Sequence, residues 1–233
     1  MNYKAVQLGL QIAEDFSPDV RITGSDGVDF YSLSSFDKNP DRINSLQMEL
    51  DSWATTQRSW LSAAPDAVNY FLIGNHEDRL RRWLWKHPEL SSLECLSIEN
   101  MFQFEKLKIT MADRGGLEQM FGDKLLITHG AIVRKYSGYT ARGELEARRY
   151  HTSMMTGHTH RGGRFCTTTP NGIVEALECY CLCSLYPEYK ANPDWQNGIV
   201  LATVQDYVQF EMIPFHNSMG SMLCRWRGKE YKV

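Results

Sequence analysis

Apolar residues recur at helical intervals in three segments of the first half of the chain. The first segment is roughly Tyr3–Phe16. The second is predicted to cover Asn39–Ala64, with Asn39 as the N-cap and Pro40 at the first helical position. The third, Arg79–Lys86, carries charged residues on one side and large apolar residues on the other. We therefore expect three helices before the middle of the chain.

Short apolar runs predict strands instead, and they are the main pattern after about Leu107. The predicted strands are Val20–Thr23, Asn69–Ile73, Leu107–Met111, Lys124–Thr128, Ile173–Cys183 and Gly198–Val208. Early helices and late strands indicate an α/β protein, layered in the α+β manner, with two sheets. The sequence contains no repeat, low-complexity segment or linker, so we expect a single domain over residues 1–233.

Composition and charge exclude some classes of protein. The chain has 233 residues, of which 42% are hydrophobic and 23% charged, and its net charge is -3. This composition is typical of globular proteins and gives no general attraction to nucleic acid or to an acidic membrane. No apolar run approaches the ~20 residues of a membrane-spanning helix, and the first residues do not begin a signal peptide. We expect a cytoplasmic protein with no membrane partner. Nucleic acid could be its substrate, but no strong basic surface would hold it.

Three of the six cysteines alternate in the segment Cys179-Tyr180-Cys181-Leu182-Cys183. In a strand, alternation places all three on one face, where thiols pack as small apolar groups. A metal site would favour a Cys-x-x-Cys turn, which this chain does not have. We therefore interpret these thiols as buried strand residues.

Three short polar motifs carry the candidate chemistry. They are Gly74-Asn75-His76-Glu77-Asp78, Thr128-His129-Gly130 and Gly157-His158-Thr159-His160. Each follows a short apolar stretch, so each is expected where a strand ends, the place where an open α/β sheet forms its site. Imidazole nitrogens, an amide oxygen and a carboxylate together suit a divalent metal that acts on a phosphate ester.

A single histidine at a strand end is more often an ordinary polar residue than a ligand. The joint pattern favours a site, because His158 and His160 are two positions apart. In an extended segment such residues face the same way, so both rings could reach one place. Gly74 and Gly157 also allow the backbone to turn sharply and approach a ligand.

At this point the chain resembles the calcineurin-like metallophosphoesterases. Their pattern is Asp-x-His, Gly-Asp-x-x-Asp, Gly-Asn-His-Asp/Glu, a later His, and Gly-His-x-His. The matches here are Ser25-Asp26-Gly27-Val28-Asp29, Gly74–Glu77, His129 and Gly157–His160. The likeness covers most of the chain and is closest to small bacterial and phage members. It implies a sandwich of two mixed sheets flanked by helices.

The resemblance also implies a role for each matched residue. Asp26 would be the carboxylate that bridges two metals, and His160 would belong to the first metal site. Asn75, His129 and His158 would complete the second site. Manganese would be the expected metal, with iron, zinc, nickel and magnesium as alternatives.

The implied reaction is phosphoester hydrolysis, with a diester preferred to a monoester as substrate. Water on the bound metal would attack phosphorus, and His76 would assist the leaving group as an acid or a charge stabiliser. Arg161 and Arg134 follow the histidine motifs and could bind the phosphate. Glu77 and Asp78 would order the loop or its histidine from behind.

The chain departs from the family pattern in two places. The Asp-x-His motif is missing, because the chain begins at the helix Tyr3–Phe16, which in the family follows the first strand. We expect that strand to be absent, leaving an open sheet edge for another strand or a second copy of the chain to cover. Ser25 stands where the family has glycine. We take Asp26 rather than Asp29 as the ligand.

These departures change what the site can hold. The first metal site keeps only Asp26 and His160, so we expect one well-held metal and a second that is weak or absent. His87, His151 and His216 are the remaining histidines that could replace lost ligands.

Three other hypotheses stay open. The chain could be a catalytically weakened or inactive scaffold that binds a metal or phosphate. It could be a truncated form of a longer, complete enzyme. It could also be a nucleic-acid-binding module, which its net charge of -3 disfavours.

Overall fold

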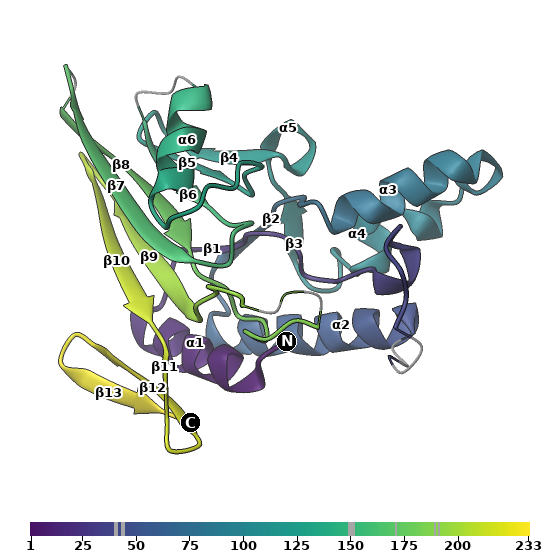
Figure 1. Cartoon of the computed structure of the whole chain (residues 1–233), viewed down its shortest axis with the longest axis horizontal. Helices are drawn as coiled ribbons and strands as arrows, with labels where there is room; N and C mark the ends of the chain where they lie inside the picture. The colour runs from purple at the N-terminus through teal and green to yellow at the C-terminus, as the bar shows by residue number, and fades with distance from the viewer. Residues whose placement is uncertain (40–41, 43–44, 149–151, 171, 189, 191) are drawn as a thin grey trace. The chain divides into compact units, whose positions relative to one another are not determined.

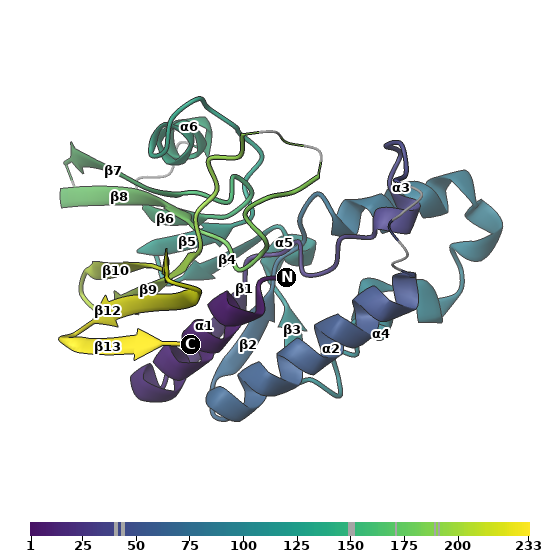
Figure 2. The ribbon, with the colours of Figure 1, turned by 60° about the horizontal axis from the view of Figure 1, so that its bottom comes forward.

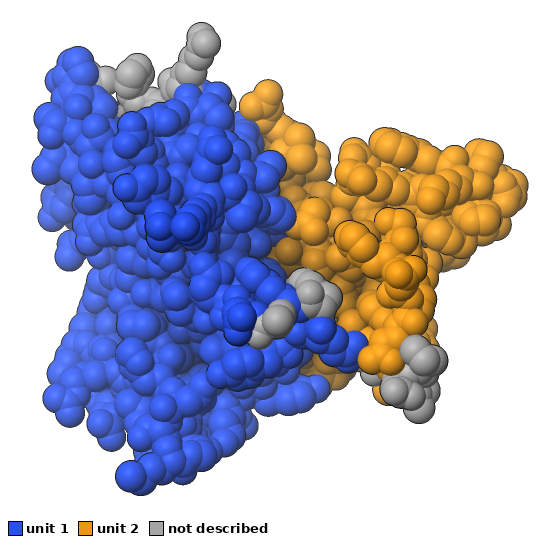
Figure 3. All heavy atoms as spheres, in the orientation of Figure 1, with its two compact units in different colours: residues 1–16, 118–233 blue, residues 17–117 orange. Residues whose placement is uncertain are grey.

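The computed structural model describes residues 1–39, 42, 45–148, 152–170, 172–188, 190 and 192–233. The chain divides into two compact units (Figure 3). Unit 1 consists of residues 1–16 and 118–233, and unit 2 consists of residues 17–117. The mixed α/β class predicted from the sequence is confirmed, whereas a single domain over residues 1–233 stays a prediction.

Unit 2 contains a small parallel sheet and several helices. Its strands are paired in the order β1 (Val20–Thr23), β2 (Val68–Phe71) and β3 (Ile109–Met111). Its helices are α2 (Leu46–Ala63), α3 (Glu77–Lys86), α4 (Ile98–Met101) and α5 (Asp113–Gly116). Three 3₁₀ turns, Tyr31–Leu33, Pro88–Leu90 and Glu94–Leu96, complete the described elements. Because β1 and β2 run in parallel, the loops that follow them leave the same edge of the sheet.

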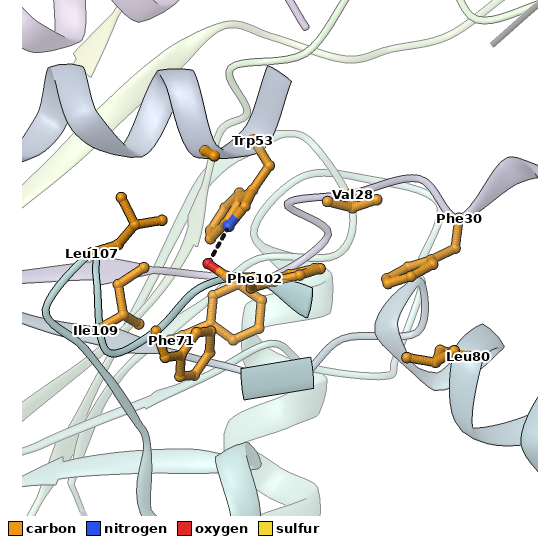
Figure 4. Close-up of a cluster of buried hydrophobic side chains, with 10 residues drawn as sticks. Val28, Phe30, Trp53, Phe71, Leu80, Phe102, Leu107 and Ile109 are labelled. Atoms are coloured by element: carbon orange, nitrogen blue, oxygen red, sulfur yellow. Dashed lines mark hydrogen bonds between the residues drawn. The ribbon is translucent and has the colours of Figure 1, made fainter. Parts of the chain in front are cut away.

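The core of unit 2 is largely aromatic (Figure 4). The Trp53 ring from α2 lies 4.8 Å from the Phe102 ring and 5.4 Å from the Phe71 ring, measured between centroids. Its indole Nε1 donates a hydrogen bond to the Phe102 carbonyl at 3.2 Å, so the one polar atom of this ring has a partner. Phe30, at the end of the loop after β1, stacks on Phe102 with centroids 5.8 Å apart. This packing fixes the loop that carries Asp26.

Unit 1 is built on a five-stranded mixed sheet (Figure 1). The strand order is β4 (Glu118–Phe121), β5 (Leu125–Thr128), β6 (Ser153–Thr156), β8 (Gly172–Cys179) and β7 (Gly162–Thr169). Strands β5, β6 and β8 are parallel, and the two edge strands are antiparallel to their neighbours. Helix α6 (Tyr139–Arg148) packs on this sheet through Ala141 and Leu145. The segments after β5, β6 and β8 therefore share one sheet edge.

The remainder of unit 1 is a hairpin, a small antiparallel sheet and the N-terminal helix (Figure 2). These elements are β9 (Gly198–Val204), β10 (Val208–Pro214), β11 (His216–Ser218), β12 (Ser221–Trp226), β13 (Lys229–Lys232) and α1 (Tyr3–Phe16). Helix α1 buries Leu8 and Ile12 against Met222 and Trp226 of β12. Every described helix of the chain is too short or too polar to cross a membrane.

Several predicted elements are confirmed, whereas the start of one helix and the extents of two late strands were predicted wrongly. Helix Tyr3–Phe16 and strand Val20–Thr23 form as predicted. Helix α2 begins at Leu46 rather than near Asn39, because the Ser45 hydroxyl accepts a hydrogen bond from the Met48 backbone N–H and caps the helix there. The proposed first helical residue, Pro40, lies outside the described residues.

The other two wrong boundaries lie in the late strands. Strand β8 ends at Cys179 because Tyr180 has a left-handed backbone, with φ 59°, so Cys181 and Cys183 do not continue the strand. The predicted strand Gly198–Val208 is two strands joined by a turn, in which the Gln205 N–H donates to the Tyr207 carbonyl at 3.0 Å.

Candidate metal centre

Two of the predicted ligands meet at the carboxyl ends of neighbouring parallel strands in unit 1. His129 follows β5 and His158 follows β6, and these strands pair in parallel. The His129 Nε2 and His158 Nδ1 atoms lie 3.0 Å apart, with the two rings edge to face. His129 is only 6% exposed, so its ring cannot turn freely into solvent. The fold therefore brings two imidazole nitrogens to one point.

The spacing of this pair fits a divalent cation. Two nitrogens bound to one ion at ~2.1 Å and a right angle lie about 3.0 Å apart. Imidazole is a suitable donor for manganese, iron, zinc and nickel alike. The pair thus offers two nitrogen donors of the predicted kind within unit 1.

His158 and His160 do not reach one place through an extended segment, as the sequence analysis expected. Both have left-handed backbones, with φ 63° and 60°. His158 faces His129, whereas the His160 Nδ1 atom faces the Cys183 thiol, with 3.9 Å between the nitrogen and Sγ. The His160 ring also packs edge to face on Trp195. The Gly-His-x-His turn therefore directs its two rings to different neighbours.

Two buried glutamates hold the loops of unit 1. The Glu144 carboxylate, from α6, accepts hydrogen bonds from the Ala131 and Ile132 backbone N–H groups at 2.5 and 2.6 Å, just after His129. The Glu178 carboxylate, from β8, accepts one from the Thr159 hydroxyl at 2.6 Å. Both carboxylates are almost fully buried. They fix the backbone beside the histidines.

The predicted phosphate-binding role of Arg161 is not supported by its surroundings. Its side chain is 4% exposed, and its guanidinium lies 3.3 Å from the Glu178 carboxylate and 3.1 Å from that of Asp194. It also donates to the Arg134 carbonyl at 2.9 Å and the Thr140 hydroxyl at 3.0 Å. These partners occupy the cation, so we assign Arg161 a structural role. Arg134 itself is exposed, and its substrate role stays a prediction.

In unit 2, Asp26 lies in the loop after β1, against the turn that follows β2. The Asp26 carboxylate accepts a hydrogen bond from the His76 backbone N–H at 3.2 Å. A Cβ atom on Gly74 would lie 2.5 Å from the Asp26 Oδ1 atom and 2.4 Å from the Ser25 Oγ atom. Only glycine therefore fits at position 74 without moving this carboxylate. Ser25 has φ 79°, a conformation that favours glycine.

Glu77 ties the same two loops of unit 2 together. Its carboxylate accepts hydrogen bonds from the backbone N–H groups of Asp26, Gly27 and Gly74 at 3.1, 3.0 and 2.9 Å. The side chain is buried, and burial together with the charge of Asp26 raises the pKa of Glu77 to about 7. Glu77 thus holds the Asp26 loop from behind. Asp78 instead pairs with Arg81 and Arg82 on the same helix.

His76 lies in a network of charged side chains. Its Nδ1 atom lies 3.2 Å from the Asp29 carboxylate, and its Nε2 atom lies 4.0 Å from that of Asp26. Burial lowers the pKa of His76, but the hydrogen bond that His76 donates to Asp29 and the charge of Asp26 outweigh it, so the net shift is upward. Burial raises the pKa of Asp29, but hydrogen bonds from His76 and Arg42 and the charge of Arg79 bring it below its usual range.

The remaining candidates are placed as follows. Asn75 is exposed between the Gly74 turn and His76. His87 is the C-cap of α3, and His216 is exposed on β11. His151 lies outside the described residues.

The interpretation of Cys181 and Cys183 as buried strand residues was wrong. Neither packs on a strand face, and both are only partly buried. A hydrogen bond from the Cys181 thiol lowers the pKa of Cys183, and His160 lowers it further. The available signal was the Cys-x-Cys spacing, but it indicates a site only once the end of β8 at Cys179 is known.

No protein-family model matches the chain, and a search of curated proteins finds no match. The assignment of the site residues therefore rests on the sequence motifs and on the geometry within each unit.

Proposed function

We propose that this chain is a metal-dependent phosphoester hydrolase that acts on phosphodiesters. The observation that supports this most directly is the His129–His158 pair, whose Nε2 and Nδ1 atoms lie 3.0 Å apart at the carboxyl ends of β5 and β6. This pair comes from two of the motifs that resemble those of the calcineurin-like phosphoesterases. The finer fold, a calcineurin-like sandwich of two mixed sheets, belongs to the same proposal.

The resemblance implies ligands in unit 2 and ligands in unit 1. Asp26 and Asn75 are the ligands proposed in unit 2, and His129 and His158 are those proposed in unit 1. A bound manganese-type cation would polarise phosphoryl oxygens and lower the pKa of bound water. The two histidines would supply neutral nitrogen donors, and the Glu144 carboxylate would hold the backbone that follows His129.

His76 is proposed to carry the proton or positive charge that the leaving oxygen requires. Asp29 accepts from its Nδ1 atom, which orients the ring and favours the protonated form. The Arg79 guanidinium, 3.2 Å from the His76 Nε2 atom, opposes protonation and also binds Asp29 at 2.6 Å. The network thus holds one imidazole at a fixed orientation beside the Asp26 carboxylate, within unit 2.

The test measures turnover and metal content on one sample. The metal-free chain is loaded with Mn²⁺, bound metal is measured by elemental analysis, and hydrolysis of an aryl phosphodiester and an aryl phosphomonoester is followed. We expect His76→Ala to retain its metal and lose most turnover, and His129→Ala to lose both. His216→Ala, which removes an exposed histidine of β11, serves as the matched control and should behave as the wild type.

Metal binding without hydrolysis of either ester would contradict the proposal. That result would favour the metal-binding scaffold instead. Turnover that is unchanged in both His76→Ala and His129→Ala would also contradict it.

A further inference from the structure

The Cys181 and Cys183 thiols lie beside His160 at the carboxyl ends of two adjacent parallel strands. His160 belongs to the segment after β6, and both cysteines belong to the segment after β8. One ligand atom from each of the three residues lies within 4.8 Å of the other two. The Cys183 Sγ atom is 3.9 Å from the His160 Nδ1 atom, which is at the outer limit of a hydrogen bond to sulfur.

This spacing suits atoms that share a metal. With metal–sulfur and metal–nitrogen bonds of ~2.3 and ~2.05 Å at a tetrahedral angle, sulfur and nitrogen lie about 3.6 Å apart. We infer that His160, Cys181 and Cys183 form a binding site for a thiophilic divalent cation, with zinc as the first choice. Two thiolates and one imidazole are soft ligands that select zinc over manganese or magnesium. Three protein ligands leave one coordination position for water or another donor.

The backbone around the three ligands is already fixed. The Gln196 N–H donates to the His160 carbonyl at 2.9 Å, and the Cys181 N–H donates to the Gln196 carbonyl at 3.1 Å. The Asn197 amide, which is buried, donates to the carbonyls of Cys181 and Cys183 at 3.0 and 2.9 Å. Gln196 and Asn197 are thus hydrogen-bonded to the backbone of all three residues, His160, Cys181 and Cys183. A cation would therefore need only small side-chain movements.

The site is distinct in chemistry from the proposed hydrolytic centre. The resemblance to phosphoesterases assigns His160 to the first metal site, of whose ligands this chain keeps only Asp26 and His160. Cys181 and Cys183 give His160 two partners within unit 1, and Asp26, Asn75, His129 and His158 remain the ligands proposed for the hydrolytic metal. Zinc binding by His160, Cys181 and Cys183 does not depend on hydrolase activity, so it is expected even if the chain hydrolyses no phosphoester.

The test uses Co²⁺ as a spectroscopic probe of thiolate binding. The full chain is reduced, freed of metal and titrated with Co²⁺, and the thiolate-to-cobalt charge-transfer band in the near ultraviolet is recorded. We expect the wild type to show the band, Zn²⁺ to abolish it by displacement, and Cys181→Ser and Cys183→Ser to lose it. His160→Ala should weaken Co²⁺ binding by more than about 100-fold, beyond the effect typical of residues behind a ligand.

Two controls separate this site from the rest of the molecule. Cys166→Ser changes an exposed thiol of β7 and should leave the band unchanged. Asp26→Asn changes the proposed hydrolytic site and should also leave it unchanged. Circular dichroism checks that each variant folds, and zinc displacement in the wild type tests the site even if a cysteine variant does not fold.

Two results would overturn the inference. One is a fully reduced wild type that shows no charge-transfer band. The other is a band that persists in both Cys181→Ser and Cys183→Ser.

Discussion

In both units a buried glutamate carboxylate fixes the loops of the candidate site residues, but the charge of that carboxylate is balanced differently in the two units. This glutamate, Glu77 in unit 2 and Glu144 in unit 1, accepts hydrogen bonds from backbone N–H groups of those loops. In unit 1, Arg148 lies 3.3 Å from the Glu144 carboxylate, and Arg161 lies 3.3 Å from that of Glu178. Within the described residues, Glu77 forms no such ion pair.

This difference shows what a counter-charge does for a buried carboxylate. Without one, burial and the nearby Asp26 charge raise the pKa of Glu77 to about 7, although backbone N–H groups stabilise the ionised form. A positive ion near Asp26 would offset the effect of the Asp26 charge on the pKa of Glu77. Unit 2 is therefore expected to be the pH-sensitive half of the chain, and unit 1 the half whose site loops depend on ion pairs.

The largest effect is expected from breaking an ion pair in unit 1. Arg161→Ala would leave the Glu178 carboxylate, which is 0% exposed, without its cation. Removing one partner of a buried pair costs about 3–5 kcal/mol of unfolding free energy. Urea unfolding measures the loss, and hydrogen exchange locates it in unit 1. Arg134→Ala, at an exposed neighbouring arginine, should change stability by less than about 0.5 kcal/mol. Equal losses in the two variants would contradict the account.

The next effect is a pH dependence in unit 2. The folded-state pKa of Glu77, about 7, lies above its ordinary value of 4.5, so the folded chain binds a proton that the unfolded chain has released between these values. Stability conferred by this group is therefore full below pH 4.5, falls as the pH rises towards 7 and is flat above it, a change of about 3 kcal/mol. Glu77→Gln should remove this slope in unfolding measured on the metal-free chain. A slope as steep as that of the wild type would show that another group titrates.

A smaller effect is expected from the glycine that touches Asp26. A Cβ atom at position 74 would overlap Ser25 and Asp26, so Gly74→Ala should cost about 1–3 kcal/mol through the forced shift of the loop. The matched control is Gly24→Ala, because a Cβ there meets nothing within 4 Å. Thermal unfolding of both variants provides the comparison. The expectation fails if Gly74→Ala is as stable as Gly24→Ala.

The smallest effect is expected at the surface of α3. Asp78 pairs with Arg81 and Arg82, whose side chains are 64% and 71% exposed. Solvent and salt screen such pairs, so Asp78→Asn should cost less than about 1 kcal/mol, including its contribution at the helix N-terminus. Chemical unfolding at low and high salt measures this. A loss of unfolding free energy as large as that of Arg161→Ala would contradict the expected difference between buried and exposed ion pairs.

The sequence predicted the features of the fold that depend on local apolar periodicity, and the site residues that directly follow a strand. Helix Tyr3–Phe16 follows from its apolar spacing, and the position of His129 follows from the apolar run that forms β5. It could not predict the left-handed turn at Tyr180, because that turn depends on close packing of the Tyr180 ring over Gly162 and Gly198. The end of β8, the positions of the two thiols beside His160 and the divergence of His158 and His160 all depend on such contacts. Burial of Arg161 was also beyond the sequence, since its partner Asp194 is 33 positions away.

The central claim is that the His129 and His158 rings bind one divalent cation, and pulsed electron paramagnetic resonance of Mn²⁺ tests it most directly. The technique detects nitrogen nuclei coordinated to the manganese ion. The account predicts imidazole nitrogen couplings in the wild type, fewer of them in His129→Ala and in His158→Ala, and no change in His216→Ala. A manganese-loaded chain whose nitrogen couplings are absent, or are the same in all four proteins, would contradict it.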